Sequence, residues 1–142
     1  MDDRDLDLRR RTYGFMVETG RAPTAGEFGE REDVIAGWRR LHEAHALVLN
    51  PATDEIRMLN PFSAVPSEYR VHARDRWWYA NCAWDAFGVC AALGADGRIE
   101  CSCPDCGEPI AVDVRAQKPG DERLLFHVLV PARQWWDDIV FT

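Results

Sequence analysis

The sequence predicts an α+β fold in two domains. Apolar residues at helical spacing dominate residues 4–45, where three short helices precede a β-hairpin. The later sequence contains several short strand-like runs and a single alanine-rich helical segment, which favours one helix packed on an antiparallel sheet. We therefore expect a winged-helix-like domain over residues 1–60 and an α+β domain over residues 61–142.

Local signals in the first 45 residues predict three helices. Apolar side chains recur on one side of residues 4–20, and Gly20 ends this helix. Thr24 followed three positions later by Glu27 is a capping-box pattern, which indicates the start of a second helix. Residues 31–45 carry apolar side chains at positions i, i+4 and i+7, which indicates a third, amphipathic helix.

A β-hairpin is expected in "ALVLNPATDEIRML", residues 46–59, where two apolar runs flank a turn region with Asn-Pro and Asp. Three helices and a hairpin have the outline of a winged helix, whose third helix either reads DNA or serves only in packing. The net charge of −7 and the acidic flanks of both arginine clusters, residues 9–11 and 39–40, oppose phosphate binding. We therefore expect a packing module and no nucleic-acid partner.

The second domain is expected to follow a linker, "NPFSAVPSEY". The segment "YRVHARDRWWYA" predicts another hairpin. In "NCAWDAFGVCAAL", Asn81 is a good N-cap, which places Cys82 in the first helical turn. This helix ends at Leu93 and Gly94. The runs "GRIECSC", "PIAVDV" and "RLLFHVLV" are expected to be strands separated by turns.

Nothing in the sequence predicts export or membrane insertion. No apolar run approaches the ~20 residues of a membrane span. The start, "MDDRDLDLRRR", has no apolar stretch after its charges, so we expect no signal peptide. The five cysteines are an odd number and three of them crowd into "CSCPDC", which favours thiols or metal ligands over disulfides. We expect a cytoplasmic protein without a membrane partner.

Cys82 and Asp85 lie three positions apart at the expected helix start. One interpretation is structural, because Cys is a small hydrophobic residue and Asp favours a helix N-terminus. The other is chemical: backbone N–H groups and the helix dipole favour a thiolate, and Asp85 shares its face and its proton. Trp77, Trp78 and Trp84 would then supply apolar walls that exclude water. The spacing alone leaves both interpretations open.

The segment "NCAWDAFGVCAALG", preceded by "WWYA", resembles the active-site helix of the organomercurial (alkylmercury) lyases. "ALVLNPATDEIRMLNPFSAVP" and "CSCPDCGEPIAV" are also similar to regions of that family, so the resemblance covers roughly residues 10–142. It implies protonolytic cleavage of carbon–mercury bonds, in which thiolates capture the soft metal and an acid protonates the departing carbon. Carried over, Cys82 matches the first catalytic cysteine and Asp85 matches the aspartate.

The family's second catalytic cysteine comes near the C-terminus, after a segment like "WWDDIVFT", and this sequence stops at Thr142. Either the sequence is a shortened product or this homologue lacks that residue. One thiolate with Asp85 is expected to bind a mercurial but to cleave it poorly, unless another cysteine substitutes. Cys90 is a poor substitute, because it follows Cys82 by just over two helical turns, about 12 Å along the axis.

The segment "CSCPDCGEP" contains Cys103 and Cys106 in the pattern of one zinc knuckle. A zinc ribbon needs a second such pair, which the sequence lacks. Cys101 would be a third ligand only if the chain turned sharply, and His127 would be a fourth. We expect no required cofactor and a reduced turn, whose thiols are candidate metal ligands that would pass mercury to or from Cys82.

We interpret the sequence as that of an alkylmercury-lyase-like protein in which Cys82 and Asp85 are the catalytic and mercury-binding residues. Mercury would be its substrate or product metal, and its partners would be a small organometal or soft-metal ligand and small thiols. Two alternatives stay open. One is a non-catalytic thiol-based heavy-metal binder that combines Cys82 with residues 101–106. The other is a metal-sensing winged-helix regulator, which the acidity opposes.

Overall fold

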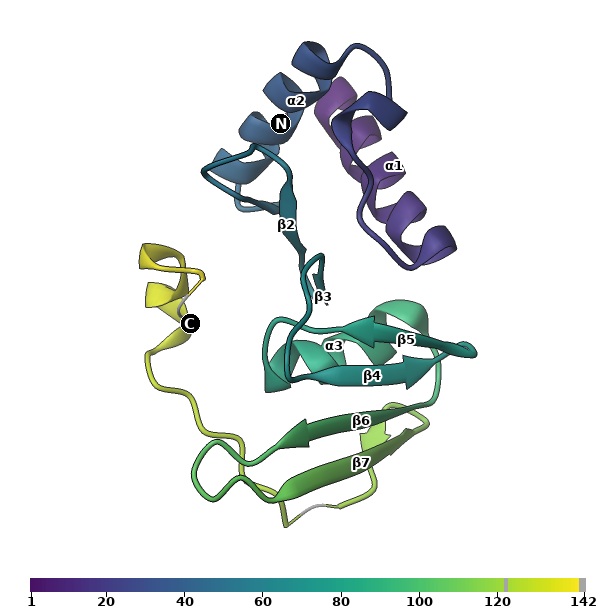
Figure 1. Ribbon diagram of the computed structural model, residues 1–142, viewed down its shortest axis with the longest axis vertical. Helices are drawn as coiled ribbons and strands as arrows, with labels where there is room; N and C mark the ends of the chain where they lie inside the picture. Colours follow the sequence, from purple (N-terminus) through teal and green to yellow (C-terminus); the bar gives the residue numbers. More distant parts are fainter. Residues whose placement is uncertain (122, 141–142) are drawn as a thin grey trace.

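The computed structural model describes residues 1–121 and 123–140. Within these residues the helices are α1 (Asp3–Thr19), α2 (Arg31–Glu43) and α3 (Ala83–Leu93), with 3₁₀ turns η1 (Ala25–Glu27) and η2 (Ala132–Asp137). The strands are β1 (Val48–Leu49), β2 (Ile56–Leu59), β3 (Phe62–Ser63), β4 (Arg70–Ala73), β5 (Arg76–Tyr79), β6 (Gly97–Ser102), β7 (Pro109–Arg115) and β8 (Lys118–Pro119). The predicted α+β class is confirmed, because N-terminal helices precede antiparallel sheets and a further helix packs on the larger sheet (Figure 1).

Helix α1 begins and ends where its sequence predicts. The Asp2 carboxylate caps the N-terminus by accepting a hydrogen bond from the Asp5 backbone N–H at 2.8 Å. At the other end, Gly20 takes a left-handed conformation with φ +80°, and its N–H donates to the Met16 carbonyl at 2.8 Å. A side chain at Gly20 would be strained in this conformation, which is why the predicted stop is a glycine.

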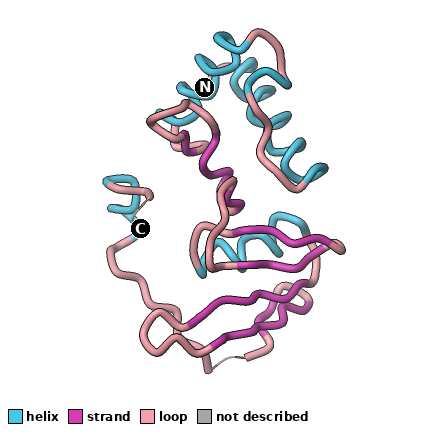
Figure 2. Tube along the Cα trace, viewed as in Figure 1, coloured by secondary structure: helices cyan, strands magenta, loops and turns pink. Residues whose placement is uncertain are grey.

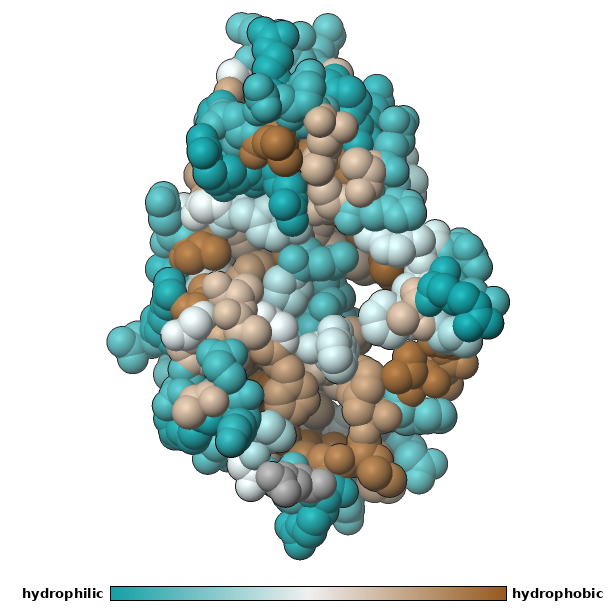
Figure 3. All heavy atoms as spheres, turned by 180° about the vertical axis from the view of Figure 1, so that it is seen from behind, coloured by the Kyte–Doolittle hydropathy of each residue, from teal (hydrophilic) through white to brown (hydrophobic). Residues whose placement is uncertain are grey.

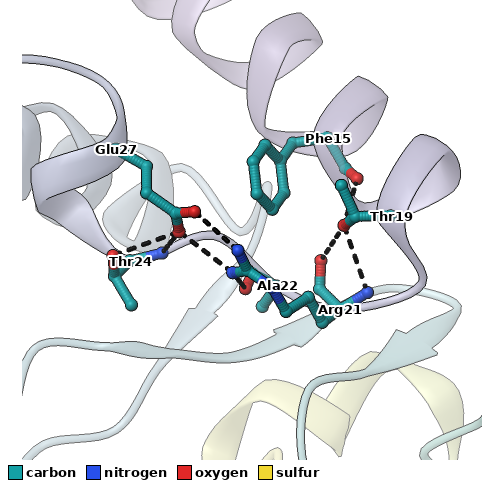
Figure 4. A network of polar contacts seen from close by, with 6 residues as sticks. All are labelled: Phe15, Thr19, Arg21, Ala22, Thr24 and Glu27. Carbon is teal, nitrogen blue, oxygen red and sulfur yellow. Dashed lines mark hydrogen bonds and ion pairs between the residues drawn. The ribbon is translucent and has the colours of Figure 1, made fainter.

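The second predicted helix is only the 3₁₀ turn η1. Thr24 and Glu27 do form the expected capping box, but it encloses this single turn. The Arg21 guanidinium binds the Glu27 carboxylate at 2.6 Å and, with the Thr24 backbone N–H, lowers the pKa of Glu27 to about 2 (Figure 4). Gly29 follows with a φ of +139°, a conformation that no helix contains. The capping box is therefore part of a local network with the Arg21–Glu27 ion pair, and it does not start an α-helix.

Helix α2 confirms the third predicted helix and packs on α1. The Trp38 indole N–H donates to the Thr12 hydroxyl at 3.1 Å, and both side chains are fully buried. The hairpin expected over residues 46–59 is also confirmed, since β1 and β2 pair antiparallel. Strand β3 pairs with β2 and completes a three-stranded sheet. The winged-helix description of this part stays a prediction.

The larger sheet has the strand order β5-β4-β6-β7-β8, and every neighbouring pair is antiparallel. In Figure 2 it lies apart from the three-stranded sheet, with α3 beside it. Val71, Ile99 and Val112 are in register on β4, β6 and β7 and are all buried. Because strand side chains alternate, His72 and Arg98 belong to the opposite, more exposed face.

One hydrophobic core continues across the proposed domain division. Its largest fully buried side chains are Trp38, Phe62, Met16, Leu41, Leu47, Leu59 and Leu93. Phe62 forms a β-bridge with Ala80, and a Cβ added to Gly88 of α3 would lie 2.9 Å from the Pro61 Cβ. Gly88 thus allows α3 to pack closely on the chain before β3. The boundary between residues 60 and 61 stays a prediction.

The strand expected in "RLLFHVLV" is wrong, because residues 123–130 contain no strand. Several apolar side chains of this segment are exposed, including Leu125 and Leu129. The segment passes along one side of the molecule to η2, where the Trp136 ring stacks on His45 with centroids 4.0 Å apart (Figure 1). Ring contacts with distant residues replace the strand pairing that the apolar pattern predicted.

The face of the molecule that Figure 3 draws has a mostly hydrophilic end and a more apolar end. In Figure 3, hydrophobic residues gather over the half that holds the larger sheet and the C-terminal segment, whereas the half formed by α1 and α2 is mostly hydrophilic.

Among residues 1–121 and 123–140, no helix is long and apolar enough to cross a membrane.

Candidate active site

Cys82 is the N-cap of α3 rather than a residue of its first turn, which corrects the predicted cap by one position. Its backbone is extended (φ −152°, ψ −178°), and its sulfur accepts a hydrogen bond from the Asp85 backbone N–H at 3.5 Å. Asp85 lies in the first turn of the helix. The structure therefore brings the two predicted residues together, with the thiol and the carboxylate at the same end of α3.

Asn81 does not cap the helix because its side chain is engaged elsewhere. Its amide nitrogen donates to the Asp85 carboxylate at 2.8 Å, to the Asn60 side-chain oxygen at 3.1 Å and to the Pro61 carbonyl at 3.4 Å. The amide oxygen of Asn81 is buried and has no hydrogen-bond partner within the structure. Asn81 thus fixes Asp85 against the chain before β3 and leaves one buried acceptor beside the site.

Burial controls the protonation of the Cys82–Asp85 pair. It raises the pKa of the Cys82 thiol above its ordinary value, although the backbone N–H groups of Asp85 and Trp84 act in the opposite direction. The backbone N–H groups at the helix start therefore favour a thiolate as expected, but burial outweighs them at Cys82. Burial also raises the pKa of Asp85, against the hydrogen bond from Asn81. Both groups hold protons to higher pH than they would in water.

Two tyrosines from other elements lie near the pair. Burial raises the pKa of Tyr69, and the charges of Cys101 and Cys82 add to this effect, so both cysteines lie within electrostatic reach of its hydroxyl. Burial likewise raises the pKa of Tyr13 on α1, and the Asp85 charge contributes. Neither tyrosine has a local sequence signal. Their proximity depends on how α1 and the chain before β4 pack around α3.

The three tryptophans predicted as walls have different environments. Trp78 is buried in the core, where its ring packs on Phe62 with centroids 5.1 Å apart. Trp77 is 43% exposed on the opposite face, because neighbouring strand residues alternate. Trp84 is 60% exposed on α3, and its ring lies 5.9 Å from that of Phe126. Trp77 is therefore not a wall of this site, and Trp84 is shielded only on one side.

The remaining cysteines occupy three distinct positions. Cys90 is fully buried, and its sulfur would lie only 2.7 Å from a Cβ added to Gly97. Cys90 is therefore a core residue. Its distance from Cys82 along the helix separately makes it a poor second ligand. Cys101 is half-buried near the end of β6 and lines an open hollow of about 580 Å³. Neither Cys82 nor Asp85 lines that hollow.

Cys103 and Cys106 lie together in the loop between β6 and β7. The backbone N–H groups of Cys106 and Asp105 and the Cys106 thiol donate to the Cys103 sulfur, and these hydrogen bonds lower the pKa of Cys103. Over the described ranges, no three His, Cys, Asp or Glu side chains are grouped as metal ligands. Within these ranges Cys101 and the exposed His127 are not grouped with the turn, and the expectation of no required cofactor stays a prediction.

Comparison with known proteins places this geometry in a family. No curated protein matches the chain. A crystal structure of the mercury-bound form of MerB2 superposes with a TM-score of 0.66 at 21% identity, over 85% of this chain. This chain spans 60% of the length of that relative. Residues 62–142, which include α3 and the whole larger sheet, match the sequence model of the alkylmercury lyases. The chain therefore belongs to the alkylmercury lyase family.

Proposed function

We propose that this protein binds an organomercurial through Cys82 and cleaves its carbon–mercury bond with a proton from Asp85. The observation that carries the proposal is the geometry at the start of α3, where the Asp85 backbone N–H donates to the Cys82 sulfur at 3.5 Å and Asn81 holds the Asp85 carboxyl at 2.8 Å. Burial raises the pKa of this carboxyl, which suits a proton carrier. Membership of the alkylmercury lyase family and similarity to a mercury-bound relative support mercury as the metal.

Capture would begin with a protonated thiol. Mercury is a soft metal that prefers thiolate sulfur, so the Cys82 thiol replaces a weaker ligand on the metal and forms a mercury–sulfur bond. The thiol proton leaves with the displaced ligand or passes to an ionised Asp85, which is the adjacent acceptor. The raised pKa of Cys82 means that this proton must be removed during binding.

Cleavage would then use Asp85 as a general acid. The carbon–mercury bond breaks, its electron pair forms a bond from carbon to the Asp85 proton, and the hydrocarbon leaves. Mercury stays on sulfur as a divalent ion. Asn81 holds the Asp85 carboxyl in place at 2.8 Å and acts as a positioning residue.

A second thiolate on mercury would increase the electron density that carbon receives. Among the described residues, Cys101 shares the neighbourhood of Tyr69 with Cys82 and is the candidate for this ligand. Small thiols would remove the inorganic mercury at the end of the cycle. Mercury is the substrate metal in this scheme, and no resident cofactor is needed.

Hydrocarbon release from an organomercurial, measured by gas chromatography with excess small thiol, tests the proposal. Cys82→Ser should abolish capture at the site. Asp85→Asn should still bind the organomercurial, but its rate of hydrocarbon release should fall by about 10²–10⁴-fold, the usual contribution of a positioned acid. Asp75→Asn is the matched control, because Asp75 is exposed in the β4–β5 turn, where a positive φ of 57° also suits Asn.

The same assay separates the enzyme from a thiol-based metal binder. One-to-one capture with no hydrocarbon release would favour the binder, and unimpaired release from Cys82→Ser would contradict both roles for this residue. A chain extended along its gene to include a downstream cysteine, where the gene encodes one, tests the two-thiolate requirement, since its release should exceed that of residues 1–142 alone.

A further inference from the structure

The loop between β6 and β7 places two cysteines on a tight, closed turn. The Cys103 N–H donates to the Glu108 carbonyl at 2.8 Å, and the Gly107 N–H donates to the Cys103 carbonyl at 2.8 Å. Gly107 adopts a left-handed conformation with φ +75°, which a glycine accommodates without strain. These hydrogen bonds close the loop at the ends of two paired strands and fix the positions of Cys103 and Cys106.

The two sulfur atoms of this turn are neighbours. The Cys106 thiol donates to the Cys103 sulfur, which also accepts from the backbone N–H groups of Asp105 and Cys106. Cys106 is exposed and Cys103 is partly exposed, so an ion in solvent reaches both.

We propose that Cys103 and Cys106 form a two-thiolate site for a soft, two-coordinate cation, with Hg²⁺ as its ion. Thiolates select soft metals, and a site of two ligands suits a cation that accepts two sulfurs, whereas structural zinc takes four ligands. No third ligand is grouped with this pair among residues 1–121 and 123–140. The site is separate from Cys82 and does not depend on the chemistry of Asp85.

Binding at this turn is ligand exchange without oxidation or reduction. Hg²⁺ forms two mercury–sulfur bonds, and any proton still held by either sulfur is released to solvent. The site would receive the inorganic mercury that carbon–mercury cleavage liberates. That role, unlike the binding itself, rests on the proposed function of Cys82 and Asp85.

Retention of Hg²⁺ against a large excess of a small monothiol tests the site in the full chain carrying Cys82→Ser. Native mass spectrometry should find one Hg²⁺ per chain. Adding Cys106→Ser should lower retention by about 10²-fold, because a single thiolate loses the advantage of two ligands held on one turn. Adding Ser102→Ala is the matched control, since Ser102 is exposed directly before Cys103 and carries no thiol, and it should leave retention unchanged.

Three results would overturn the assignment. Equal retention of Hg²⁺ with and without Cys106→Ser would show that Cys103 and Cys106 do not form the binding site. Loss of retention with Cys101→Ser would add a third ligand and contradict two-coordination, as would full occupancy by Zn²⁺ under the same competition. Failure of hydrocarbon release in the chain with intact Cys82 would contradict the proposed function alone, because retention is measured without that residue.

Discussion

Cys82 and Cys103 receive hydrogen bonds of the same kind, yet their pKa values move in opposite directions. Each sulfur accepts from backbone N–H groups two or three residues ahead in the chain. Cys82 lies in a partly buried corner at the start of α3, where the cost of removing a charge from water raises its pKa. Cys103 lies on a surface loop, where the same donors lower its pKa because solvent reaches the sulfur.

The comparison shows that a helix N-terminus does not by itself make a cysteine reactive. Backbone donors and desolvation oppose each other, and burial decides the balance. At α3 burial raises the pKa of both groups, which suits the acid role proposed for Asp85. At the β6–β7 loop the backbone donors lower the pKa of Cys103, which suits the binding of a soft ion.

The largest expected contrast is in alkylation by iodoacetamide at neutral pH. Cys103 should react about tenfold faster than Cys82 or more, because only the thiolate attacks the reagent. Cys90 should react most slowly, since its side chain is fully buried. Peptide mapping after limited labelling gives the three rates. Faster labelling of Cys82 than of Cys103 would reverse the comparison, and labelling of Cys90 at the Cys82 rate would favour a structural role for both.

A moderate effect is expected at Asn81. Removing its hydrogen bond by Asn81→Ala should slow hydrocarbon release severalfold, because the Asp85 carboxyl is then less well positioned. It should also raise the pKa of Asp85, because this hydrogen bond stabilises the carboxylate. The alkaline decline in rate should therefore move to higher pH, and the pH–rate profile measures this.

Asn60→Ala is the matched control for that experiment. It removes a different partner of the Asn81 amide and leaves the contact with Asp85 intact. A purely structural role for Asn81 predicts that both variants lose rate and that neither shifts the profile.

The smallest effect is on stability. Burial raises the folded-state pKa of Asp85. Below the ordinary aspartate pKa the folded and unfolded states are both protonated, so Asp85 makes no pH-dependent contribution to the free energy of unfolding there. Stability should fall as the pH rises from that value through the folded pKa. Asp85→Asn lacks this loss, and its melting temperature should exceed that of the unmodified chain by a margin that widens across this window. Thermal melts at a series of pH values measure this difference in melting temperature, with Asp75→Asn as the control. A difference that stays constant with pH would contradict the prediction.

Local signals in the sequence predict much of this fold. Gly20 ends α1, and the hairpins and α3 lie within a residue or two of their expected positions. The capping box at Thr24 was correctly identified, but the sequence did not reveal that Gly29 and the Arg21–Glu27 ion pair limit it to one turn. Local patterns identify where an element starts more reliably than how far it continues.

The site was predicted only in its two central residues. The resemblance to alkylmercury lyases led to Cys82 and Asp85, and the structure places them together. The contact of Asn81 with Asn60 joins residues 21 positions apart, and no local pattern encodes it. The raised pKa of Cys82 also depends on tertiary burial, which no local pattern in the sequence encodes.

The most direct test of the account is the titration of the Asp85 carboxyl, followed by NMR of the carbon in ¹³C-labelled protein and assigned with Asp85→Asn. The account predicts a midpoint above the ordinary aspartate value, and above that of Asp121, whose pKa Arg123 lowers to about 2. A midpoint at or below the ordinary aspartate value would contradict the raised pKa that burial gives Asp85, and with it the basis on which this carboxyl is proposed as the acid that protonates carbon.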